Sequence, residues 1–243
     1  MLSPSEMKDR MLDLAKQDGF IDGIFNYCDR WCDRCEFTQQ CRNHAFGEEA
    51  PPPEGPAFWD YIHNVFEATM LMIKESMVKL EISQEDIDKY THEDDDPAKH
   101  PLYHRAHQLA FTMHAWLEKN KPGPISCEED EIVVSVPENN NMLSDAIDII
   151  YYYNFFVSAK IYRALLSDDN YGEGIIQNDS NGSAKIALVA LDRLIAAWSI
   201  LMENQSKYED EILKFLISLA EVRNQAETKF PYARKFIRPG FDR

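Results

Sequence analysis

Residues 184–202 read AKIALVALDRLIAAWSILM, and this stretch decides the fold class. Apolar side chains occupy nearly every position instead of one stripe, which is typical of a helix that is buried on all sides. Asp192 and Arg193 interrupt the stretch, so each needs a partner or an exposed edge. We therefore expect a largely buried helix in a helical protein.

The stretches on either side extend this expectation. Residues 142–166 are also apolar almost all round, and the sequence predicts one continuous central helix there. Apolar residues at helical spacing predict three further helices, over about 58–80, from Pro97 or Pro101 to about 119, and over 206–229. In the first of these, the predicted core stripe comprises Ile62, Val65, Phe66, Thr69, Met70, Ile73, Met77 and Leu80. The fold class is thus all-α, a helical bundle of about five main helices with an N-terminal cysteine-rich metal-binding segment.

Three regions follow from the composition along the chain. Residues 1–47 hold a short helix and the cysteines, and the helix begins at a capping box over Ser3–Glu6. Residues 48–57 are rich in proline and predict a stiff connector. Residues 58–243 are assigned to the bundle, and the whole is expected to form one structural unit. The short apolar run over 131–136 is treated as irregular, since a single strand cannot make a sheet.

Four of the five cysteines lie within residues 28–41, CDRWCDRCEFTQQC, with the spacing C-x3-C-x2-C-x5-C. Cysteines this dense indicate a shared centre, and thiolates select zinc or an iron–sulfur cluster. Structural zinc is commonly held by two short C-x2-C turns, whereas this segment has one and no glycine between Ile24 and Phe46. We therefore predict that Cys28, Cys32, Cys35 and Cys41 bind one centre, with a [4Fe–4S] cluster favoured over zinc.

The spacing of Cys32, Cys35 and Cys41 resembles part of the [4Fe–4S] loop of the helical DNA glycosylases related to endonuclease III. It is similar, too, to auxiliary-cluster domains of some radical enzymes. This resemblance covers about ten residues and implies the ligand type alone. Cys28, Cys32 and Cys35 also have the spacing of the radical S-adenosylmethionine triad, but Cys41 would fill the iron that such enzymes leave open.

Three alternatives stay beside the cluster prediction. Zinc would make the chain a stabilised protein-interaction module, and the cysteines could also be two disulfides or free thiols. Disulfides need an oxidising compartment, whereas residues 1–10 lack the apolar core of a signal peptide, so we expect a cytoplasmic protein. His44 is a spare ligand candidate, expected at the surface, and the lone Cys127 is expected to be a packing residue.

The charge narrows the classes of partner. With 42 acidic and 25 basic residues the net charge is −17, which opposes binding to nucleic acid or to an anionic membrane. No apolar run reaches the roughly 18 residues needed to span a bilayer. The acidic surface is compatible with a basic protein partner. We expect the basic tail over 232–239 to pack back on the protein.

One further pattern suggests a site in the bundle. His100, His104, His107 and His114 lie on one predicted helix face, and His63 with Glu67 on another helix offer two more ligands. Such a set suits a metal or proton-transfer enzyme, but a stripe opposite the apolar face is ordinarily solvent-exposed. The chain has no H-E-x-x-H, G-x-S-x-G or E-x-x-H motif. We assign no catalytic residue, and whether the chain is an enzyme stays open.

Overall fold

The computed structural model describes residues 2–48, 50–83, 85–86, 96–122, 138–166 and 174–242. Within these ranges the regular structure is helical and contains no β-strand, which confirms the all-α prediction. None of the described helices combines the length and the apolarity needed to cross a membrane. Cys127 and the run over 131–136 lie outside the described residues.

The chain forms two compact units, which are described separately. The first comprises residues 1–94 together with 238–243, and the second comprises residues 95–237. The sequence-based division placed everything from residue 58 onward with the bundle. The difference arises because the helix that follows the proline-rich connector packs against the N-terminal helix, within the first unit.

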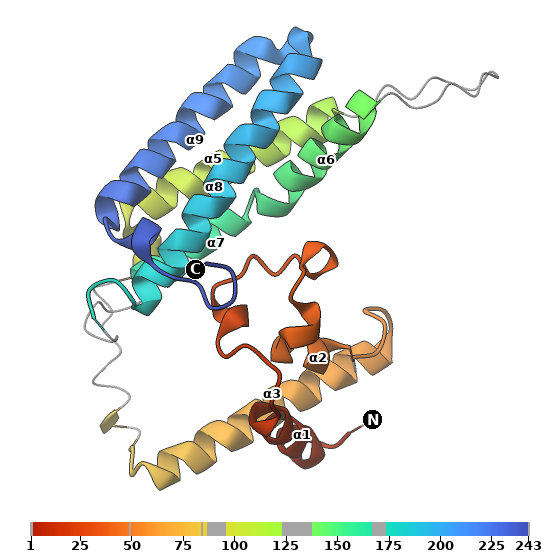
Figure 1. Ribbon diagram of the computed structural model, residues 1–243, viewed down its shortest axis with the longest axis vertical. Coiled ribbons are helices and arrows are strands. Elements are labelled where there is room, and N and C mark those ends of the chain that lie inside the picture. Colours follow the sequence, from red (N-terminus) through yellow and green to blue (C-terminus); the bar gives the residue numbers. More distant parts are fainter. Residues whose placement is uncertain are drawn as a thin grey trace, which may run out of the picture. The chain divides into compact units, whose positions relative to one another are not determined.

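The second unit is a helical bundle built around α8 (Asp179–Asn204). Helix α8 packs against α6, α7 and α9, and Figure 1 shows it running among these helices. The other helices are α5 (Pro101–Asn120), α6 (Glu138–Tyr153), α7 (Phe156–Leu166) and α9 (Glu209–Lys229), with 3₁₀ turns at Pro97–Lys99, Ser206–Tyr208 and Ala233–Lys235. Alanines 184, 187, 190 and 197 are buried along α8, and these small side chains let its neighbours approach closely.

Two sequence predictions about the apolar helices need correction. Residues 142–166 form two helices, because the chain breaks at Asn154, whose buried side-chain amide donates to the Ala110 carbonyl of α5 at 3.0 Å. The central helix is therefore α8. It also begins five residues earlier than predicted, at Asp179, because the side chain of Asn178 caps it by accepting from the N–H of Asn181 at 2.8 Å.

The charged pair within α8 has the partners that the sequence required. Asp192 accepts from Arg223 of α9 at 3.3 Å and from Arg234 at 2.6 and 3.2 Å. Arg193 donates to the hydroxyl of Tyr153. Arg234 therefore holds part of the basic tail against α8, which agrees with the expectation that the tail packs back.

The first unit contains α1 (Pro4–Lys16), α2 (Arg42–Gly47) and α3 (Pro56–Lys79). The predicted capping box at Ser3 and Glu6 is present, and Pro4 takes the first helical position. Helix α1 crosses α3 (Figure 1), and Met7, Tyr61 and Ala68 form the buried cluster between them.

Helix α3 buries only one edge of the predicted stripe. The stripe has the correct helical period, but five of its members, Phe66, Thr69, Met70, Ile73 and Leu80, are exposed. The buried residues of α3 are Tyr61 and Ala68, which lie outside the predicted stripe, and the half-buried Ile62 and Val65 from its edge pack against the same cluster. The small side chain of Ala68 lets α1 approach closely, and this contact selects the buried face.

Candidate metal centre

The cysteine segment is built from three short 3₁₀ turns that follow one another without a long helix. They span Ile24–Asn26, Cys32–Arg34 and Thr38–Gln40. Cys35 and Cys41 each end a turn, and their N–H groups donate back to Cys32 O at 3.1 Å and to Thr38 O at 3.2 Å. Successive tight turns of this kind curl the chain, so cysteines that are separated in sequence come to face one region.

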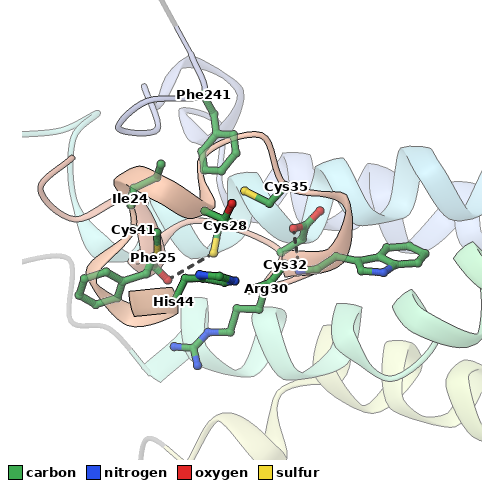
Figure 2. A pocket seen from close by; sticks show the side chains of 12 residues that line it. Ile24, Phe25, Cys28, Arg30, Cys32, Cys35, Cys41, His44 and Phe241 are labelled. Carbon is green, nitrogen blue, oxygen red and sulfur yellow. Dashed lines mark hydrogen bonds between the residues drawn. The ribbon is translucent and has the colours of Figure 1, made fainter. Parts of the chain in front are cut away.

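All four cysteines line a single hollow (Figure 2). Figure 2 shows Phe241 on one side of the hollow and His44 on the other. The remaining lining residues come from the same segment and are Ile24, Phe25, Asp29, Arg30, Trp31 and Thr38. Cys32 is exposed, whereas Cys28, Cys35 and Cys41 are half-buried, so the hollow opens to solvent near Cys32.

The sulfurs share the hollow without meeting at one point. Each of the four is a free thiol. Among the residues that the structure describes, no three His, Cys, Asp or Glu side chains are arranged as ligands of a single ion. The thiol of Cys28 instead donates to the carbonyl of Phe25, with Sγ 3.6 Å from the oxygen. A change of side-chain rotamers would be needed before all four sulfurs bound one ion.

The thiols nevertheless affect one another electrostatically. Burial raises the pKa of the Cys32 thiol, and the neighbouring Cys28, Cys41 and Cys35 raise it further. Burial also raises the pKa of Cys28, although the backbone N–H of Arg30 opposes this shift. Several thiolates in one hollow therefore repel each other unless a cation compensates their charge, and a metal ion supplies that charge.

One backbone N–H group points at a sulfur from two residues downstream: the N–H of Phe37 donates to Sγ of Cys35 at 3.4 Å. The backbone of Arg30 near Cys28 lowers the pKa of that thiol and opposes the effect of burial. Arg30 has a φ of 62°, a left-handed conformation that is uncommon for a residue other than glycine. Hydrogen bonds to sulfur stabilise the thiolate form, and this is the form that binds metals.

The arginines near the cysteines serve the local fold. Arg42 donates from Nε to Leu14 O at 2.9 Å and from Nη2 to Gln17 O at 3.2 Å, and it pairs with Asp22. It thereby joins the start of α2 to the end of α1. The guanidinium of Arg34 lies 3.9 Å from the centre of the Trp31 ring. Arg34 and Arg42 therefore both have partners within the protein, and these contacts account for their presence without a neighbouring anionic cluster.

Sequence reasoning missed the residues that close the hollow from the far end of the chain. Phe241 packs edge-on against Phe37, with 5.0 Å between ring centres. Gly240 lies so close to Ile24 and Ile21 that a Cβ there would come within 3.0 and 3.1 Å of their Cδ1 atoms. No local pattern connects positions that are about 200 residues apart in sequence, although a glycine beside an aromatic residue is a weak signal of close packing.

His44 also has a larger role than expected. It is half-buried in the wall of the hollow and lies one helical turn after Cys41, at the start of α2. Its Nδ1 is 3.9 Å from a carboxylate oxygen of Glu48, which is long for a hydrogen bond. Its ring is therefore a candidate fifth ligand group beside the four cysteines.

The histidine stripe of α5 lies in the second unit and does not form a ligand cluster among the described residues. His104 is exposed, while His107 stacks on Tyr103 with 5.1 Å between ring centres and His114 contacts Phe155. His63 and Glu67 are exposed on α3, in the first unit. The stripe thus acts mainly in ring packing, and no catalytic residue is assigned to it.

No protein-family model, curated protein or solved structure matches this chain.

Proposed function

We propose that Cys28, Cys32, Cys35 and Cys41 together hold one metal centre, a [4Fe–4S] cluster, that serves electron transfer, redox sensing or local folding. The observation that carries this proposal is the single hollow lined by all four side chains. Isolated packing cysteines have no reason to gather in one place, and a half-buried group of thiols is an unusually good set of ligands for a soft metal.

One hydrogen bond favours thiolate ligation, and burial opposes it in the metal-free protein. Sγ of Cys35 accepts the N–H of Phe37, whereas burial raises the pKa of the Cys28 and Cys32 thiols and so favours their protonated forms. Metal binding would therefore release protons and place the thiolate charges next to a cation.

The arrangement of the four thiols around one hollow favours a cluster over a single ion. A zinc ion needs four sulfurs at about 2.3 Å in a tetrahedron, so all four would have to converge on one point. A cluster has four iron corners, each of which takes one sulfur. Thiols that line a common hollow without meeting require less rearrangement to bind the larger group.

The expected role follows from the coordination. Four cysteines on four irons leave no open iron, so the centre would not bind a substrate directly. The exposure of Cys32 would bring one corner of the cluster close to solvent, where electrons can pass to a partner protein. Solvent access near that corner would also help set the reduction potential.

A structural zinc site is the second candidate, and one observation favours it. The cysteine hollow is bordered by the start of α2 and by the C-terminal segment around Phe241, so a metal would clip together parts of the first unit that are distant in sequence. The protein would then act through an acidic surface on a basic protein partner.

Single Cys→Ser replacements test the proposal. Each of the four, made in protein purified without oxygen, should lose iron and sulfide together, whereas Cys127→Ser should retain both. His44→Ala is the informative extra variant, because loss of metal there would show a mixed cysteine–histidine site. Full metal content in all four serine variants would refute the assignment.

A further inference from the structure

Helix α3 carries a second apolar face that lies opposite the one buried against α1. Trp59 is 68% exposed, Phe66 67%, Met70 47% and Ile73 46%. At 100° per residue these side chains lie on one stripe, about half a turn away from Tyr61 and Ala68. At ~200 Å² for a large aromatic side chain, Trp59 and Phe66 alone leave roughly 270 Å² in contact with solvent.

The spacing of this face is that of a two-helix seam. Trp59, Phe66, Ile73 and the C-cap residue Leu80 repeat every seven residues. The alternate positions hold Met70 and Met77, with the polar His63 in the first turn of the seam. A heptad with apolar residues at these two positions packs helices as knobs into holes. Helix α3 has 24 residues, so it offers a seam about 36 Å long.

The charges beside the seam identify the partner and its direction. Glu67 and Lys74 are exposed on the same flank, one heptad apart, and the exposed Asp60 precedes them by one heptad near the start of the helix. The other flank carries the uncharged Ile62, Thr69 and Ser76. When two identical helices pair antiparallel, like flanks face each other. Glu67 then meets Lys74 of the partner subunit, and the two-fold symmetry repeats the pair. A parallel pair would place Glu67 opposite an uncharged flank.

We propose that α3 forms an antiparallel two-helix interface with a second copy of this chain. In the register set by Glu67 and Lys74, Met70 packs beside Ile73 of the partner subunit. This interface is independent of the metal centre, because the seam faces away from the contact that α3 makes with α1.

Charge reversal gives a test that is specific for direction. Glu67→Lys places two lysine pairs across the seam and Lys74→Glu places two glutamate pairs, so each should weaken self-association roughly ten-fold. An equimolar mixture of the two variants pairs opposite charges at both places and should associate as tightly as the original chain. Sedimentation velocity over a range of concentrations measures each dissociation constant.

Two further variants complete the design. Phe66→Glu puts a charge in the middle of the seam and should leave only monomer, while Glu203→Lys, a matched charge change on α8, should have no effect. A full chain that stays monomeric at every concentration would overturn the proposal, whether another part of the chain or another protein covers the face. Failure of the mixture to restore association would overturn the antiparallel arrangement.

Discussion

Replacing Gly240 by alanine is the sharpest perturbation of the contact that closes the cysteine hollow. Gly240 has a φ of +80°, and an added Cβ would lie 3.0 Å from Cδ1 of Ile24 and 3.1 Å from Cδ1 of Ile21. Ile24 is buried, so its side chain has little space in which to yield. The substitution therefore combines a backbone cost with a packing cost.

The two costs can be separated with a matched variant. A residue other than glycine in the left-handed region costs about 1–2 kcal/mol. Overpacking a filled site adds about 1–3 kcal/mol. Gly19 has a φ of +91° and no atom within 4 Å of an added Cβ, so Gly19→Ala carries the backbone cost alone. We expect Gly240→Ala to destabilise the first unit by about 2–5 kcal/mol and Gly19→Ala by about 1–2 kcal/mol.

Hydrogen exchange measured by mass spectrometry reports the effect locally. The N–H of Phe241 donates to Arg238 O at 3.2 Å, and it should lose protection in Gly240→Ala but keep it in Gly19→Ala. Peptides over residues 24–41 should follow the same pattern, because Phe241 packs on Phe37. Equal protection of the C-terminal segment in both variants would refute the view that close packing at Gly240 holds this segment on the cysteine hollow.

The second unit gives two further predictions. Trp198 is fully buried and contacts Phe215 with 4.9 Å between ring centres. In urea unfolding, Trp198→Ala should therefore lower the free energy of unfolding by about 3–5 kcal/mol, whereas Ile217→Ala, at an exposed position, should change it by less than about 0.5 kcal/mol. Comparable losses in both variants would contradict the assignment of α8 as the core helix. Burial raises the pKa of Asp192, but hydrogen bonds from Arg234 and Arg223 outweigh it and hold the pKa below its usual range. The stabilisation is therefore present above the unfolded-state pKa of about 3.9 and is lost as the pH falls through the lower folded-state pKa. Because Asp192 is partly exposed, Asp192→Asn should lower the free energy of unfolding by about 1 kcal/mol or less at pH 7. Urea unfolding at several pH values should show this loss shrinking on acidification. A loss that stays constant with pH would contradict stabilisation by the ionised Asp192 carboxylate.

Local sequence patterns predicted the features that depend on neighbouring residues. The helix periods, the capping box at Ser3 and the need for partners at Asp192 all follow from residues within one or two turns, and the structure confirms each of them. The break at Asn154 could not be predicted, because it depends on the carbonyl of Ala110 in another helix. Composition alone made residues 142–166 look continuous.

Two features that could not be predicted from the sequence both depend on long-range packing. The sequence predicts one apolar stripe on α3, but it does not say that only the edge of this stripe meets α1, since that choice depends on how closely Ala68 lets the neighbouring helix approach. The wall that Phe241 adds to the cysteine hollow is equally invisible, because long-range packing brings it there. The cysteine ligand set, in contrast, was predicted from its spacing and stays a prediction.

Metal analysis of the whole chain, purified without oxygen, tests the central claim most directly. We expect iron and acid-labile sulfide in equal amounts, about four of each per chain, together with visible absorption that is bleached by a reductant. Thiol titration should find the four clustered cysteines blocked until the metal is removed. Stoichiometric zinc without iron, or metal-free protein in which Cys28, Cys32, Cys35 and Cys41 all react as free thiols, would contradict it.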